Sequence, residues 1–96
     1  MITSKQRSYL RSLANTIDPI FQVGKGGISE SMVQQVKDAL EARELVKITV
    51  LKNSMLDTRE ACEEMAERTG AEPVQVIGNR FVLYKRSKEN QKIFLD

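Results

Sequence analysis

The sequence predicts a single α/β domain in which a four-stranded mixed sheet packs against helices, with the element order α-β-α-β-α-β-β. Its 96 residues are enough for one small domain. Apolar residues recur at helical spacing in three segments, and β-rich runs lie between and after them. Each of two strand–helix–strand units predicts a pair of parallel neighbouring strands, and a terminal hairpin adds an antiparallel pair. We expect residues 1–96 to form one domain, and the sequence leaves the strand order open.

The first helix is expected to begin after Thr3, because Thr3 and Gln6 have the spacing of a capping box. Asp18 should end it, since the residue before Pro19 is disfavoured in helical backbone. The apolar stripe of this helix consists of Leu10, Leu13, Ala14 and Ile17. The basic residues off that stripe, which we expect on the exposed side, are Lys5, Arg7 and Arg11.

A short strand is predicted over residues 20–23, followed by a stretch rich in glycine. Ser29 is a good N-cap for a second helix that runs to about Arg43. The segment "ELVKITVLK" is the clearest strand pattern in the chain. Its apolar residues Val46, Ile48 and Val50 alternate with Lys47 and Thr49. This alternation predicts a strand with one buried face.

The third helix should start after Asp57, which has capping-box spacing to Glu60, and should end at Gly70. Two β-rich runs then flank residues 78–79, a Gly-Asn pair suited to a tight hairpin turn. The chain closes with a polar, basic segment that has an apolar end. The sequence leaves open whether residues 87–96 are a flexible tail or whether that end docks.

The composition argues against several classes of protein. The chain has no histidine, and Cys62 is its single cysteine. An internal disulfide is therefore excluded and a zinc site is disfavoured. We expect no cofactor, no metal and no enzymatic activity. Neither a membrane-spanning apolar run nor a secretory signal pattern is present, so the expected location is the cytoplasm.

Charge is unevenly distributed along the chain, although its net value is only +2. Residues 1–29 carry a net +3, residues 30–72 a net −4, and residues 73–96 again a net +3. Basic segments that meet in space attract a polyanion. The pattern therefore favours a nucleic-acid partner, provided that the two basic ends converge.

Gly24, Lys25, Gly26 and Gly27 form a glycine loop between the first strand and the second helix. Glycines let an anion approach the backbone closely, and the N–H groups at a helix start attract negative charge. The P-loop and dinucleotide fingerprints do not fit, and what remains is G-x-x-G, the pattern with which KH domains clamp a nucleic-acid backbone. The alternative is a tight turn that needs glycine only for a positive φ.

Four segments together resemble one family. They are "KQRSYLRSLA", "VGKGGISESM", "LEARELVKITVLKN" and "TGAEPVQVIGNRFVLYK". The chain is similar to the CRM (chloroplast RNA splicing and ribosome maturation) domain in its free-standing bacterial form, the YhbY family. The resemblance implies a fold like the C-terminal domain of translation initiation factor three. It also implies an RNA-binding module with a G-x-x-G loop and a basic surface. Bacterial members are associated with precursors of the large ribosomal subunit.

The expected partner is therefore ribosomal RNA, bound by a monomer. The candidate RNA-binding residues are Gly24, Lys25, Gly26, Gly27, Lys5, Arg7, Arg11, Lys52 and Asn53. Lys52 and Asn53 are included because they follow the second strand, whose end should lie beside the glycine loop. Two rival functions remain open. One is a small enzyme that holds a phosphorylated ligand in the loop, and the other is a ribosome-associated adaptor that contacts protein only.

Overall fold

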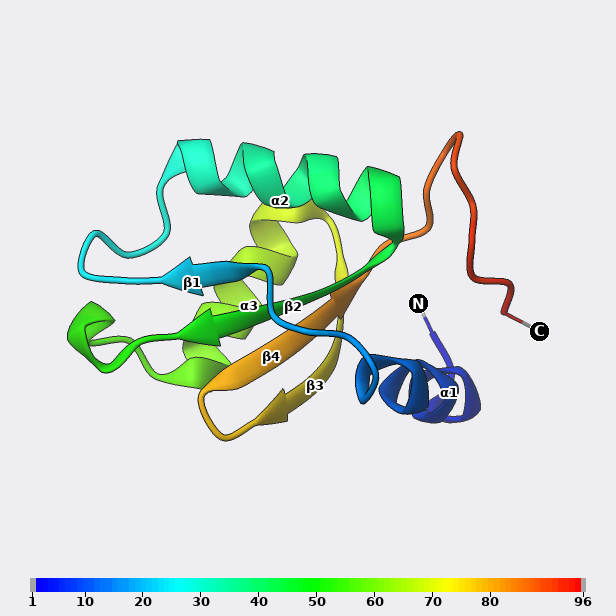
Figure 1. The fold of residues 1–96 in the computed structure, drawn as a ribbon, viewed down its shortest axis with the longest axis horizontal. Helices are drawn as coiled ribbons and strands as arrows, with labels where there is room; N and C mark the ends of the chain where they lie inside the picture. The colour runs from blue at the N-terminus through cyan, green and yellow to red at the C-terminus, as the bar shows by residue number, and fades with distance from the viewer. Residues whose placement is uncertain (1, 96) are drawn as a thin grey trace.

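A computed structural model describes residues 2–95, which form three helices and one four-stranded sheet (Figure 1). The elements in chain order are α1 (Ser4–Ala14), β1 (Phe21–Val23), α2 (Glu30–Arg43), β2 (Leu45–Val50), a 3₁₀ turn (Lys52–Ser54), α3 (Thr58–Thr69), β3 (Glu72–Ile77) and β4 (Arg80–Tyr84). This confirms the predicted α/β class and the element order.

The strands lie in the order β1-β2-β4-β3. β1 and β2 are parallel neighbours, as the first strand–helix–strand unit predicts. For the second unit the prediction of parallel neighbours is wrong, because β4 lies between β2 and β3 and is antiparallel to both. Burial explains the order. Phe81, Val82 and Leu83 of β4 are fully buried, so this strand needs neighbours and cover on both sides. β3 contains Pro73, which is tolerated at a sheet edge.

The two faces of the sheet are covered unequally (Figure 1). Helices α2 and α3 pack on one face, where Ile48 and Phe81 are central to the larger apolar cluster. Helix α1 packs on the other face, over one end of the sheet only, against Leu45, Val82 and Tyr84. We call this second, partly uncovered side the open face. Because Leu45 is buried under α1, β2 has apolar residues on both faces, and the prediction of one buried face is wrong.

The helix ends follow the predicted capping residues. Thr3 and Gln6 form the full capping box of α1, and Ser29 caps α2 through Met32 N–H. Asp57 accepts the first-turn N–H groups of α3, and that helix ends at Gly70 in the left-handed conformation. The predicted end of α1 is wrong. The helix stops at Ala14, before Pro19 could act, and the remaining residues form the linker to β1.

The segment after β4 packs back on the domain through two carboxylates of α2. Glu44, the fully buried C-cap of α2, accepts the N–H groups of Ser87, Lys92 and Ile93 at 2.6–2.8 Å. Glu41 accepts the Ser87 hydroxyl at 2.6 Å and two further N–H groups of the segment. Ile93 and Leu95 then join the apolar cluster under α1. We call this arrangement the glutamate clasp.

The clasp holds both carboxylates in the charged form. For Glu41, the hydrogen bond from the Ser87 hydroxyl is the main cause of a lowered pKa. For Glu44, burial by itself would raise the pKa, but the three backbone N–H donors together outweigh it, and the pKa lies below its ordinary value. Hydrogen bonds to the charged form therefore dominate at both residues.

Candidate nucleic-acid interface

The glycine loop is a β-turn. Gly27 N–H donates to the carbonyl of Gly24 at 2.9 Å, which closes residues 24–27 into one turn. Gly27 has a φ of +69°, a conformation that strains any residue with a Cβ. A Cβ on Gly26, in contrast, would meet nothing within 4 Å. Turn formation therefore accounts for Gly27, whereas the turn gives no steric reason for glycine at position 26.

The glycine loop lies beside the turn that follows β2, as Figure 1 shows at one end of the molecule. Leu51 N–H donates to the carbonyl of Val23 at 2.9 Å and so extends the pairing of β1 with β2. A Cβ on Gly24 would lie 3.9 Å from Oδ1 of Asn53. The structure thus brings Lys52 and Asn53 next to the loop, because the parallel strands end at the same edge.

The far side of the loop is fixed by α3. Nη1 of Arg68 donates to the carbonyl of Ile28 and to the carboxylate of Glu64, both at 3.0 Å. Arg68 is therefore engaged in holding the chain between the loop and α2. Lys25, within the loop, and Lys52, in the adjacent turn, are both exposed.

Part of the loop's backbone is available to an anion. The N–H groups of Lys25 and Gly26 meet no acceptor within residues 2–95, whereas that of Gly27 is used in the turn. The helix does not start directly behind the loop, because two residues intervene before α2 begins at Glu30. The carboxylate of Glu30 already opposes the positive helix end. An anion here would be held by loop N–H groups, Lys25 and Lys52 more than by the helix dipole.

The basic residues of α1 lie at the opposite end of the molecule from the glycine loop (Figure 1). Lys5 and Arg11 are exposed, as expected. Arg7 is not, because its side chain is half-buried and its Nε donates to the carbonyl of Pro73 at 3.3 Å. Arg7 therefore ties α1 to β3, and the structure does not place these three residues beside the loop.

Two further cations, on strands β2 and β4, are not among the predicted site residues. Lys47 points to the open face, because its neighbours Val46 and Ile48 point into the α2–α3 cluster. Arg80 pairs with Thr49 across the sheet and alternates with buried Phe81, which places it on the same face. The alternation of "ELVKITVLK" already put Lys47 opposite the buried residues. The position of Arg80 could not be predicted without knowing that β4 lies next to β2.

Acidic residues gather on the other side of the sheet. The exposed carboxylates of α2 and α3 are Glu30, Asp38, Glu60, Glu63, Glu64 and Glu67. Because both helices cover the same face, the acidic middle of the sequence forms one side of the molecule. Lys37, Arg43 and Arg59 are also exposed on these helices, but the carboxylates outnumber them. The open face carries Lys47 and Arg80, and α1, whose exposed cations are Lys5 and Arg11, packs over one end of it. The charge segregation seen along the chain thus becomes a difference in net charge between the two faces.

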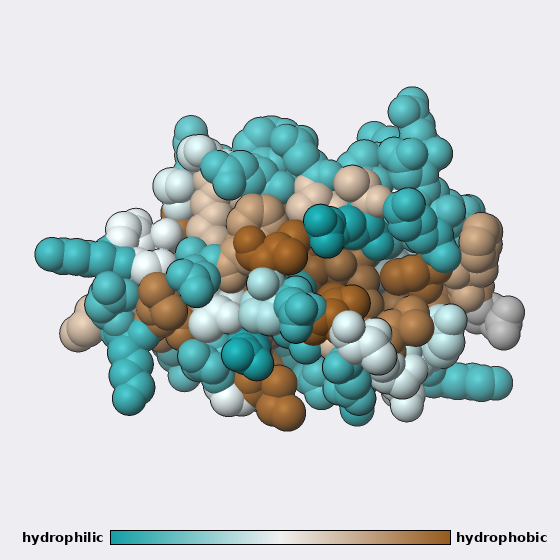
Figure 2. Space-filling model, in the orientation of Figure 1, coloured by the Kyte–Doolittle hydropathy of each residue, from teal (hydrophilic) through white to brown (hydrophobic). Residues whose placement is uncertain are grey.

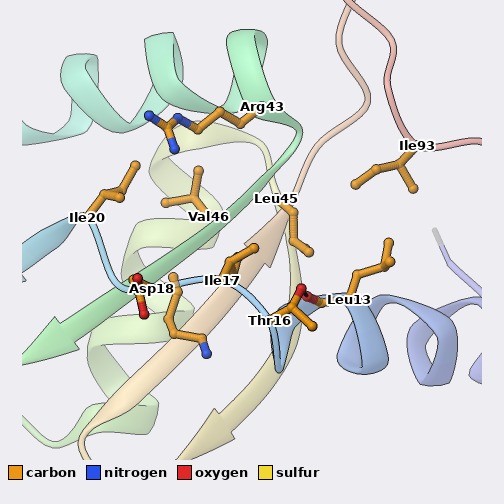
Figure 3. Close-up of a pocket in the computed structure, with 10 residues that line it drawn as sticks. Leu13, Thr16, Ile17, Asp18, Ile20, Arg43, Leu45, Val46 and Ile93 are labelled. Atoms are coloured by element: carbon orange, nitrogen blue, oxygen red, sulfur yellow. Dashed lines mark hydrogen bonds between the residues drawn. The ribbon is translucent and has the colours of Figure 1, made fainter.

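Apolar side chains also reach the surface of the open face. Figure 2 shows them over its middle, with hydrophilic residues around them. They line a groove of about 480 Å³ between α1, the linker to β1, β2, the C-terminal end of α2 and the segment after β4. In Figure 3, Leu13, Leu45 and Ile93 lie on one side of the groove, with Arg43 and Ile20 on the other. Thr16, Ile17, Val46, Lys47 and Asp18 also line it, and Asp18 is the one carboxylate among the described lining residues.

The part of the chain that the structure describes has neither a reactive thiol nor a cluster of metal-ligating side chains. Burial raises the pKa of the Cys62 thiol to about 11, so the thiol stays protonated and unreactive near neutral pH. Within residues 2–95, no group of three potential ligand side chains is placed to hold a metal ion. Across the same residues, no helix has the length and apolar character needed to cross a membrane.

A family model described as the CRS1 / YhbY (CRM) domain matches residues 2–85. The chain belongs to the CRM domain family. It is 50% identical over 95 residues to the Bacillus subtilis protein named probable RNA-binding protein YqeI, with 99% of each chain covered. It is 30% identical to a Haemophilus influenzae protein named RNA-binding protein, over 92% of this chain and 89% of that one.

A solved structure confirms the CRM-domain architecture. The solution structure of the hypothetical protein SAV1595 from Staphylococcus aureus, described as a candidate RNA-binding protein, is 55% identical. It superimposes with a TM-score of 0.83 and covers 100% of both chains. The names of both relatives give RNA binding and no enzymatic activity, in agreement with the expectation for this CRM domain.

Proposed function

We propose that this CRM domain binds RNA along the open face and at the glycine loop. The observation that carries the proposal is the division of charge between the two faces of the sheet. Lys25 and Lys52 at one end, Arg80 and Lys47 along the strands, and α1 at the other end form a discontinuous cationic path. A polyanion is attracted to such a path and repelled by the acidic α2–α3 side.

We further propose that the RNA is ribosomal, in precursors of the large ribosomal subunit, and that the protein acts there as a monomeric assembly factor in the cytoplasm. The family resemblance supports this assignment, since bacterial members are associated with such precursors. The shape of the domain is compatible with binding to a segment of RNA. The principal dimensions of 39 × 25 × 22 Å describe an elongated body whose open face can follow a single RNA segment.

The experiment is co-sedimentation of the tagged protein with ribosomal particles from its own cells, before and after ribonuclease treatment. We expect the protein in the large-subunit precursor fractions and its release by ribonuclease. Crosslinking followed by sequencing of the bound RNA should recover large-subunit ribosomal RNA.

Two outcomes would contradict the proposal. Retention on particles after the accessible RNA has been digested would favour a protein-binding adaptor. Crosslinks confined to other RNAs would leave RNA binding in place and refute the ribosomal assignment. The enzyme alternative has weaker structural support, because Asp18 is the one carboxylate among the described residues that line the groove of Figure 3, and the chain has no histidine.

A further inference from the structure

The exposed aromatic side chains lie together. The chain has two tyrosines and three phenylalanines. Phe81 and Tyr84 are buried in the core, and Phe21 packs against it. Tyr9 and Phe94 are 48% and 70% exposed, and both line one pocket of about 310 Å³. These two aromatics are 85 positions apart in sequence, so their meeting depends on the fold.

The position of Phe94 follows from the glutamate clasp. Ile93 N–H donates to the Glu44 carboxylate at 2.7 Å, and Ile93 and Leu95 pack into the cluster under α1. With both neighbours turned inward, Phe94 is left facing outward beside α1. The clasp thus fixes one aromatic wall of the pocket, and α1 provides the other through Tyr9.

Charge and polarity complete the pocket. Lys5 lies one helical turn before Tyr9, so the two side chains share a face of α1. The remaining lining residues are Thr3, Gln6 and Leu95, and none of the six is acidic. A planar apolar group with a negative charge next to it matches these walls. An unpaired nucleotide has that chemistry, with its base between the rings and its phosphate at Lys5.

We propose that Tyr9 and Phe94 form a stacking site for an unpaired base of the bound RNA. This inference rests on the proposed function and makes it more specific, because it requires a single-stranded segment at the α1 end of the open face. Stacking on aromatic side chains needs no particular base, so the site contributes affinity with little sequence preference.

The test compares Tyr9→Leu and Phe94→Leu with the matched control Tyr9→Phe. The probes are a single-stranded RNA oligonucleotide containing 2-aminopurine and a blunt duplex of the same length. Each leucine variant should bind the single strand about tenfold more weakly, since it loses the stacking of one base. Tyr9→Phe should bind like the parent. 2-Aminopurine fluorescence should fall when the parent binds and fall less with the leucine variants, while duplex affinity stays unchanged.

Thermal unfolding by circular dichroism must show parental stability for each variant. If a leucine variant is destabilised, the site is tested by 2-aminopurine quenching with the parent and Tyr9→Phe alone. The absence of quenching when the parent binds then overturns the site. Leucine variants that bind the single strand as well as the parent also overturn it, while RNA binding itself stands. A parent that binds no RNA refutes the proposed function instead. A parental dimer that Phe94→Leu dissociates would show that the pocket receives a second copy of the chain.

Discussion

Replacing Glu44 by alanine is expected to lower the free energy of unfolding by about 3 kcal/mol. The carboxylate is fully buried and accepts three backbone N–H groups, and its loss leaves those donors without an acceptor. Glu44 has a φ of +67°, and alanine in the same conformation carries a similar backbone strain, so the substitution isolates the carboxylate. Urea denaturation followed by circular dichroism measures the change.

The matched control is Glu63→Ala, which removes an exposed glutamate of α3 and should change the stability by less than about 0.5 kcal/mol.

Protonation of Glu44 at low pH should lower the free energy of unfolding as the Glu44→Ala substitution does. Because the folded-state pKa of Glu44 lies below the ordinary 4.5, its contribution is complete above that pH. The contribution is lost as the pH falls through the lowered value. Glu44→Ala should therefore flatten the acid branch of the stability curve, and an unchanged branch would contradict the clasp.

Gly26→Asp is expected to weaken RNA binding by roughly tenfold, or about 1.4 kcal/mol, because it adds a negative charge where the RNA phosphate would lie. The fold should tolerate it. Gly26 does not have the positive φ that makes Gly27 sensitive, and its Cβ would face open space. Lys25→Ala should cost less, about 1 kcal/mol at most, as the loss of one exposed ionic contact. Binding is measured by fluorescence anisotropy with a labelled single-stranded RNA.

Gly26→Asn separates charge from shape, since asparagine has nearly the size of aspartate without its charge. We expect Gly26→Asn to fall between the parent and Gly26→Asp. Melting temperatures should be the same for all three proteins. A Gly26→Asp variant that melts normally and binds RNA as tightly as the parent would show that the glycine loop is only a turn.

Local signals in the sequence predicted most of the fold. The capping residues Thr3, Ser29 and Asp57 act within one helical turn, so their effect does not depend on the rest of the molecule. The place of β4 between β2 and β3 was not predictable in this way. It depends on which strand is buried on both faces, and "RFVLYK" does not show that until α1 is known to cover Val82 and Tyr84.

The candidate site was predictable at the glycine loop and less so elsewhere. Lys52 and Asn53 could be placed beside the loop because parallel strands end together. Arg7 was placed wrongly, since the carbonyl of Pro73 that it contacts comes from the distant strand β3. Arg80 and the pocket between Tyr9 and Phe94 depend on contacts between segments far apart in the chain. Helical or strand periodicity contains no information on such contacts.

The salt dependence of RNA binding tests the central claim, that the open face binds the RNA, most directly. The experiment uses two double variants. The open-face variant is Lys47→Gln/Arg80→Gln, and the helix variant is Lys37→Gln/Arg59→Gln, which removes the same amount of positive charge from α2 and α3. With about four phosphates neutralised, the parent should show a log–log slope near −3 on single-stranded RNA, from roughly −0.7 per contact. The open-face variant should have a slope near −1.5, and the helix variant should match the parent. A flat response in the parent, or equal slopes for the two variants, would contradict the account.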